Sequence, residues 1–230
     1  MQGESDLPPG QYESEDFPRF GLTPFARRFP KNTSRVELRI EGEVPEPVTV
    51  SEELRELPRV LQVSDFHCVT TWSRRSLEWG GFRFADLFER IVVPRASPDP
   101  KATFVVFRCQ DGYRAGLLLE DLLAKDVLLA DTLNGEPLTI EHGAPLRLVA
   151  PAHYGYKNPK HVSRIEFWCD AQRYHPAGFR FMDHPRARVA LEERGRVFPG
   201  VFLRYIYRPL IRPTVKRFRL AMDEYRNGAI

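Results

Sequence analysis

The sequence has few of the features that mark specialised protein classes. None of its apolar runs is long enough to span a bilayer, and it contains no helix-turn-helix, zinc-finger or RNP pattern. The net charge of +3 is too small to indicate nucleic-acid binding by itself. The three cysteines, Cys68, Cys109 and Cys169, are odd in number and far apart, so neither a disulfide framework nor a CxxC metal knuckle is predicted. A globular protein of a reducing compartment fits these absences.

The chain divides into three segments by composition. Residues 1–16 are acidic and polar, the opposite of a signal peptide, which predicts a flexible leader and a cytoplasmic location. Residues 17–183 carry the alternating and helical apolar patterns of one domain, and their first part, 17–30, is predicted to be an extended aromatic and basic arm. Residues 184–230 form a basic and aromatic C-terminal extension.

Short strands with a few short helices are predicted within the domain. In residues 35–41, Val36, Leu38 and Ile40 alternate with charged residues, which is typical of a half-buried strand. Asn134-Gly135 is a hairpin signal. Further strands are expected over 60–66, 102–107, 146–150 and 162–167, and helices over 51–57, 84–91 and 119–125. Because strands and helices do not alternate as βαβ units, the fold class is predicted to be a β-rich α+β domain.

The C-terminal extension combines cations with apolar residues. Residues 199–222 contain six basic and no acidic side chains, interleaved with aromatic and aliphatic ones, and Pro209 and Pro213 are expected to divide any helix into short pieces. One interpretation is an arm packed on its own domain or on a second subunit. The other is a docking surface for an acidic redox partner or an anionic membrane face.

The first candidate for a chemical role is the thiol in DFHCVTTWS, residues 65–73. Cys68 follows an apolar strand at the point where the chain becomes polar, and a strand terminus presents a side chain rigidly into a cleft. A lone cysteine is also compatible with a small buried apolar residue. The adjacent His67 additionally permits a cysteine-protease-like or zinc site, although no spaced Cys/His pair elsewhere supplies further zinc ligands.

Two later segments carry further polar side chains. The first is EHGAPLR, residues 141–147, and the second is PAHYGYKNPKH, residues 151–161. Lys157 and Lys160 lie three residues apart beside Gly155, which allows close backbone approach, so the loop suits a phosphate group. A solvated basic loop is the alternative, and neither segment matches a P-loop or a GxGxxG fingerprint.

Taken in order, these motifs resemble one family over about residues 17–168. The similarity rests on EGEVPEPVTV, DFHCVTTWS followed by WGGF, FRCQDGY, LNGEPLTIEHGAPLRLVAP and HYGYKNPKHVSRIEF. It is to the molybdopterin-binding domain of the sulfite oxidase family, which includes small bacterial relatives and the catalytic subunit of methionine sulfoxide reductase. The resemblance implies a sulfite-oxidase-like fold that binds molybdenum with a pyranopterin cofactor. Cys68 stands at the position of the thiolate metal ligand, and a soft thiolate suits this metal.

The same resemblance implies a set of cofactor contacts. In this sequence they are His67, Cys109, His142, Arg147, Tyr154, Lys157, Asn158 and Lys160. Cys68 is expected to be the catalytic residue.

The implied reaction is two-electron oxygen-atom transfer on a small oxyanion such as sulfite or on a sulfoxide. Electrons are expected to pass to or from a separate partner protein, because the chain has no haem or flavin motif. Arg19, Arg74 and Arg75 are candidates for gathering an anionic substrate. Thr70 and His161 depart from common family residues, so no particular substrate is assigned. The alternatives are an enzyme working in the reductase direction and a non-catalytic binding module of the same fold.

Overall fold

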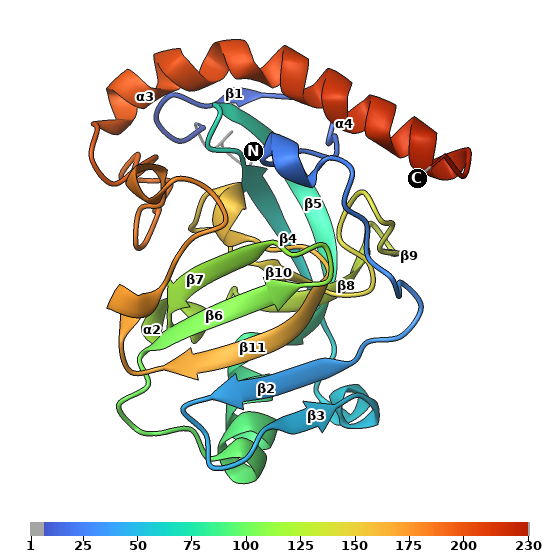
Figure 1. The fold of residues 1–230 in the computed structure, drawn as a ribbon, viewed down its shortest axis with the longest axis vertical. Coiled ribbons are helices and arrows are strands. Elements are labelled where there is room, and N and C mark those ends of the chain that lie inside the picture. Colours follow the sequence, from blue (N-terminus) through green and yellow to red (C-terminus); the bar gives the residue numbers. More distant parts are fainter. Residues whose placement is uncertain (1–6, 230) are drawn as a thin grey trace, which may run out of the picture.

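The computed structural model describes residues 7–229, which fold into two β-sheets around a shared core (Figure 1). The first sheet consists of β1 (Tyr12–Glu13), β4 (Val60–His67), β5 (Trp72–Arg83), β8 (Leu128–Leu133), β9 (Glu136–Pro137) and β10 (Arg147–Val149). The second has the order β3-β2-β11-β6-β7 and consists of β2 (Leu38–Gly42), β3 (Val48–Val50), β6 (Phe104–Cys109), β7 (Arg114–Leu118) and β11 (Val162–Trp168). The prediction of a β-rich α+β domain is confirmed.

The helices are few and mostly short. The α-helices are α1 (Phe84–Leu87), α2 (Leu119–Leu122), α3 (Gly200–Tyr207) and α4 (Ile211–Arg226). A π-helix, Phe88–Ala96, continues α1. The 3-10 turns are Thr23–Phe25, Glu52–Glu56, Gly155–Lys157, Ala171–Arg173, Arg180–Met182 and Arg208–Leu210. Among residues 7–229, none of these helices has the length and apolarity needed to cross a bilayer.

The core lies between the inner faces of the two sheets. In β2, Leu38 and Ile40 are fully buried while Arg39 is exposed, as the alternating pattern predicts. The apolar run Phe104–Phe107 of β6 is buried on both faces, because β6 lies between β11 and β7 and is covered by side chains on each side.

The longest strand, β5, was not predicted from its sequence. It pairs with β4, β8 and β1 and is therefore central to the first sheet. The polar residues after Trp72 and the pair Gly80-Gly81 resemble a loop. The structure requires the second glycine, since a Cβ atom on Gly81 would lie 2.1 Å from the carbonyl oxygen of Leu129.

The segment predicted to be a flexible leader is partly built into the fold. Residues 1–6 lie outside the described residues. Tyr12 and Glu13 form β1, which pairs in parallel with the start of β5, and the side-chain amide of Gln11 donates to the Cys68 carbonyl at 3.2 Å. The prediction of disorder is wrong for residues 7–16, because their backbone groups find partners beside the Cys68 turn.

The C-terminal extension forms a helical ridge, residues 200–226, that arches over one end of the molecule beside β1 (Figure 1). Pro209 lies in the 3-10 step between α3 and α4, as its missing N–H predicts. The expectation that Pro213 also breaks the helix is wrong. It lies in the first turn of α4, where backbone N–H groups have no intrahelical acceptor to lose.

Candidate functional site

A cavity of about 300 Å³ lies between the first sheet, the N-terminal arm and the helical ridge. Its walls come from the arm 17–25, the turn after β4, the loop 155–161 and the inner faces of α3 and α4. Cys68, Arg147, Lys160 and His161 all line it, so residues far apart in the sequence meet at one place. The wall is mainly apolar, and the polar groups that reach it are therefore poorly solvated.

Cys68 occupies a tight turn between β4 and β5. Its backbone N–H donates to the Trp72 carbonyl at 2.8 Å, and its own carbonyl accepts from the Thr71 N–H at 3.1 Å. The Sγ atom is buried and lies 3.1 Å from Oγ1 of Thr70. Burial raises the pKa of the Cys68 thiol, while the Thr70 contact and the charges of Arg194 and Lys160 act in the opposite direction.

Arg147 is a fully buried cation with incomplete hydrogen bonding. It begins β10, and its Nη1 donates to the His142 carbonyl at 2.9 Å. Its Nη2 is buried and has no partner among the described residues. The guanidinium lies 4.8 Å from the Trp79 ring centre, and burial lowers its pKa to about 9. Burying a guanidinium without a counter-charge costs free energy, so an anionic group is the expected partner of Arg147.

Lys160 and His161 add polar groups to the same wall. The Nζ of Lys160 donates to the Glu141 carbonyl at 2.6 Å, and burial, followed by repulsion from Arg147 and Arg19, lowers its pKa well below the ordinary value. The Nδ1 of His161 lies 2.6 Å from the Ala144 carbonyl, and burial lowers the pKa of this imidazole to about 4. The cavity wall therefore gathers the basic side chains of Arg19, Arg147 and Lys160 against the Asp111 carboxyl group, and a bound anion would stabilise their charged forms.

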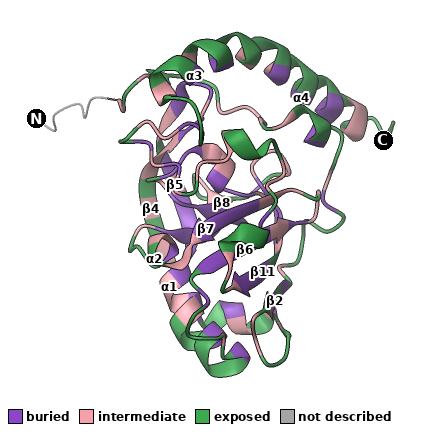
Figure 2. Cartoon of the chain, turned by 60° about the vertical axis from the view of Figure 1, so that its left-hand side comes forward, coloured by how far each residue is buried: buried purple, intermediate pink, exposed green. Residues whose placement is uncertain are grey.

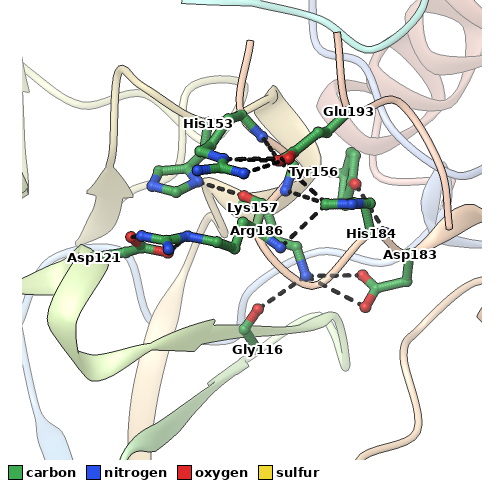
Figure 3. A network of polar contacts seen from close by, with 11 residues as sticks. Gly116, Asp121, His153, Tyr156, Lys157, Asp183, His184, Arg186 and Glu193 are labelled. Atoms are coloured by element: carbon green, nitrogen blue, oxygen red, sulfur yellow. Dashed lines mark hydrogen bonds and ion pairs between the residues drawn. The ribbon is translucent and has the colours of Figure 1, made fainter. Parts of the chain in front are cut away.

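Lys157 points away from this wall, into a separate polar network (Figure 3). Its Nζ donates to the Gly116 carbonyl at 2.9 Å and to Asp183 Oδ1 at 3.1 Å. The network continues through Tyr156 and His184, whose backbone N–H donates to the Tyr156 hydroxyl. The charge of Lys157 is thus already compensated, whereas that of Lys160 faces the cavity.

Asn158 and Tyr154 organise the loop from within. The Asn158 side chain accepts from the Ala150 N–H at 2.6 Å and donates to the His153 carbonyl at 3.2 Å, so its polar atoms tie the loop to the end of β10. Tyr154 is fully buried with the Arg194 guanidinium 5.0 Å from its ring centre. Only Asn158 of the two reaches the cavity wall.

Three further residues predicted as cofactor contacts lie behind the wall. His67 Nδ1 is 2.7 Å from Ser73 Oγ, Cys109 belongs to the main core, and His142 stacks on Phe17 with 4.7 Å between ring centres. A direct cofactor role for each stays a prediction. Within residues 7–229 no group of three or more His, Cys, Asp or Glu side chains is arranged to hold a metal, which gives the zinc alternative no support.

The arginines considered as substrate-gathering groups are placed differently from one another. Arg19 lines the cavity, but its guanidinium donates to the arm carbonyls of Ala26 at 2.6 Å and Arg28 at 2.8 Å. Arg74 donates to the Ser14 carbonyl and Arg75 lies near Asp65, both outside the cavity wall.

The sequence analysis missed the part of the wall formed by the ridge and the residue that holds the Cys68 turn from behind. Tyr207, Leu210, Thr214 and Phe218 line the cavity. Arg194, fully buried, donates to the Val69 carbonyl at 2.6 Å and to the Pro9 carbonyl at 3.1 Å. The four-residue spacing of Thr214, Phe218 and Met222 was the available signal for an inward helix face.

Comparison with known proteins assigns most of the chain to one family. The model of the oxidoreductase molybdopterin binding domain matches residues 26–175. An uncharacterized oxidoreductase of Bacillus subtilis, YuiH, is 36% identical over 164 residues, covering 70% of this chain and 78% of that protein. The catalytic subunit of the protein-methionine-sulfoxide reductase MsrP of Campylobacter jejuni is 30% identical over 191 residues, covering 70% of this chain and 62% of that protein.

A solved structure shares the fold. The sulfane dehydrogenase SoxCD of Paracoccus pantotrophus is similar with a TM-score of 0.50 and 22% identity, covering 59% of this chain and 38% of that chain. The matched region thus spans less than two thirds of the MsrP subunit and of the SoxCD chain. The family match contains Cys68, Arg147 and Lys160 but not the arm before residue 26 or the helical ridge.

Proposed function

This chain belongs to the family of oxidoreductase molybdopterin-binding domains, and from that premise we propose that Cys68 is the protein ligand of its molybdenum. Molybdopterin is the cofactor of the family. The observation that carries the proposal is that one cavity contains both the buried Cys68 thiol and the fully buried Arg147 guanidinium. A thiophilic metal and an anionic cofactor group need this combination.

The residues present fit the cofactor. Arg147 Nη2 lacks a partner among the described residues, and the neighbouring Lys160 ammonium is bound by a single carbonyl, so both can donate to a phosphate. Because burial opposes their charged forms, a bound dianion stabilises both cations. We assign Lys157 and Asn158 a supporting role, since their polar atoms hold the loop that presents Lys160.

When bound, the cofactor supplies two-electron oxygen-atom transfer. The chain's own contribution is to present the Cys68 sulfur on a rigid turn and to exclude water. The Gln11 amide and the Arg194 guanidinium fix the carbonyls of Cys68 and Val69, and therefore the direction of the turn. Phe66 and Trp72 line the cavity beside the thiol, and this mainly apolar wall disfavours water next to the sulfur.

A small oxyanion such as sulfite, or a sulfoxide, is the proposed substrate class. The positive charge of the cavity supports an anionic or strongly polar oxygen donor or acceptor, and the name of the MsrP relatives supports a sulfoxide. A separate electron-transfer protein is the proposed partner, because the sequence has no haem or flavin motif.

Metal analysis of the purified protein, joined to mass spectrometry of the released cofactor, tests the proposal. We expect molybdenum and a pterin phosphate, and zinc in their place would overturn the metal assignment. Turnover is then measured with sulfite, methionine sulfoxide and small N-oxides, using ferricyanide and reduced viologen as artificial carriers. If fully loaded protein turned over none of these substrates with either carrier, the enzymatic role would be contradicted and a binding module would be favoured.

A further inference from the structure

The outward face of α3 is made entirely of large apolar side chains. Val201, Phe202, Tyr205 and Ile206 point away from the domain and are 47% to 69% exposed, whereas Leu203 and Tyr207 face inward and are buried. A helix that is apolar all round is normally covered on every side. In Figure 2 the inner residues of the ridge are buried and its outer residues are exposed. This outward face is an uncovered apolar surface.

The apolar face continues into a cluster of cations on α4. Lys216, Arg217 and Arg219 are exposed on α4, and Arg208 and Arg212, also exposed, lie between them and α3 in the sequence. Within residues 7–229, none of these five cations lies within ion-pair distance of a carboxylate. By contrast, Arg204, on the inner side of α3, pairs with Glu192 at 2.8 Å. Unpaired positive charge is therefore concentrated on the part of the ridge that adjoins the apolar face of α3.

We propose that this ridge docks on an anionic phospholipid surface, with the outward side chains of α3 among the acyl chains and the cations of α4 on the headgroup phosphates. The arrangement has the two components of an interfacial amphipathic helix, a large apolar face and adjoining Lys and Arg residues. Phe202 and Tyr205 are aromatic, and aromatic rings are favoured at a bilayer interface.

The shape of the ridge favours a bilayer over a protein groove. The helix α3 belongs to an arch at the end of the molecule (Figure 1), and its four exposed apolar residues are not part of the wall of the cavity beneath the ridge. A projecting apolar helix can enter a lipid interface without a complementary partner surface. Lys and Arg near an anionic leaflet each strengthen attachment, and the five cations lie on the same ridge as the apolar face.

Vesicle flotation of the molybdenum-loaded protein tests this proposal without reference to turnover. We expect the protein to float with vesicles of phosphatidylcholine and phosphatidylglycerol at low salt, to float less with phosphatidylcholine alone, and to be released by salt. The double variant Phe202→Ser with Ile206→Ser should weaken attachment about tenfold or more, because it removes inserted apolar area. The double variant Arg217→Gln with Arg219→Gln should weaken binding to the anionic vesicles only.

A matched control uses apolar residues that are equally exposed elsewhere. Leu61 and Val63 lie on the outer side of β4 and are 72% and 65% exposed, so Leu61→Ser with Val63→Ser should leave attachment unchanged. Equal flotation of the wild type with both kinds of vesicle, or an equal loss in the β4 control, would overturn the proposal. The proposal would also be overturned if light scattering showed that the wild type is a dimer and the α3 variant a monomer, because a second copy of the chain would then cover the apolar face. Failure of the proposed chemistry would leave flotation unaffected.

Discussion

The guanidinium of Arg19 lies 5.1 Å from the centre of the Phe218 ring, which joins the N-terminal arm to α4. The same guanidinium also lies 4.4 Å from the centre of the Phe29 ring. Both Arg19 and Phe218 line the cavity that contains Cys68. The inner side of the ridge is therefore structural, whatever its outer side binds.

The first prediction concerns this contact. Phe218→Ala should destabilise the fold by about 3 kcal/mol, because it leaves a hole beside Arg19 where a buried ring had been. It should also increase the rate at which molybdenum is lost on dialysis. Leu220→Ala, on the exposed side of the same helix, is the control and should change neither quantity measurably. Urea unfolding and metal analysis measure the two effects.

The second prediction concerns Cys68, the proposed metal ligand. Cys68→Ser should abolish turnover while changing the free energy of unfolding by less than about 1.5 kcal/mol, because oxygen has nearly the volume of sulfur but is a poor ligand for this metal. The exposed Cys169 offers the control variant Cys169→Ser, which should keep full turnover. Full turnover of the Cys68 variant would show that Cys68 is not the metal ligand and that its role is that of a buried structural residue.

The third prediction separates the two lysines of the 155–161 loop. Lys160→Ala should lower molybdenum content with little loss of stability, since its ammonium faces the cavity and is held by one carbonyl. Lys157→Ala should instead destabilise the fold by about 2 kcal/mol, because Asp183 and the Gly116 carbonyl lose their shared donor. Metal content and urea unfolding of both variants decide the matter, and unchanged metal content in both would make the loop purely structural.

The fourth prediction concerns stability in acid. Burial lowers the pKa of His161 to about 4 and that of His142 to about 3, so the unfolded chain, whose histidines keep ordinary values, binds protons first. Stability is therefore retained above about pH 6.5 and is lost as the pH falls from there toward 4. Each histidine should contribute about 2 kcal/mol of that loss between pH 7 and pH 5.

His161→Asn tests this contribution in cofactor-free protein. Asparagine tolerates the positive φ of 57° at this position and does not titrate. The difference in unfolding free energy between pH 7 and pH 5 should shrink by about 2 kcal/mol in the variant. The exposed His175 supplies the comparison, and His175→Asn should leave the difference as it is in the wild type. An undiminished pH dependence in the His161 variant would show that His161 is not the group responsible.

Local patterns in the sequence predicted the strands with clean alternation and the motif that carries Cys68. They failed where tertiary pairing decides the conformation. β5 has the composition of a loop around Gly80 and Gly81, and it is a strand because β4 and β8 supply partners on both sides.

In the site, too, local sequence patterns predicted some features, while tertiary contacts decide others. Lys157 and Lys160 are three residues apart and were predicted to bind one ligand, yet they diverge. The 3-10 turn Gly155–Lys157 directs Lys157 toward Asp183, while Lys160 lies just before the left-handed backbone of His161 and faces the cavity. The walls supplied by the arm and α4 depend on contacts across nearly the whole chain, which no local pattern encodes.

A cavity with walls from both ends of the chain has a consequence for biosynthesis. The arm at residues 17–25 is synthesised before the strands of the two sheets, and α4 is synthesised after them. The part of the cavity wall that the ridge supplies is therefore missing when the sheets of the domain have been synthesised. It is added only when Phe218 of α4 packs against Arg19. We expect a cofactor to enter most easily in the interval between these two events.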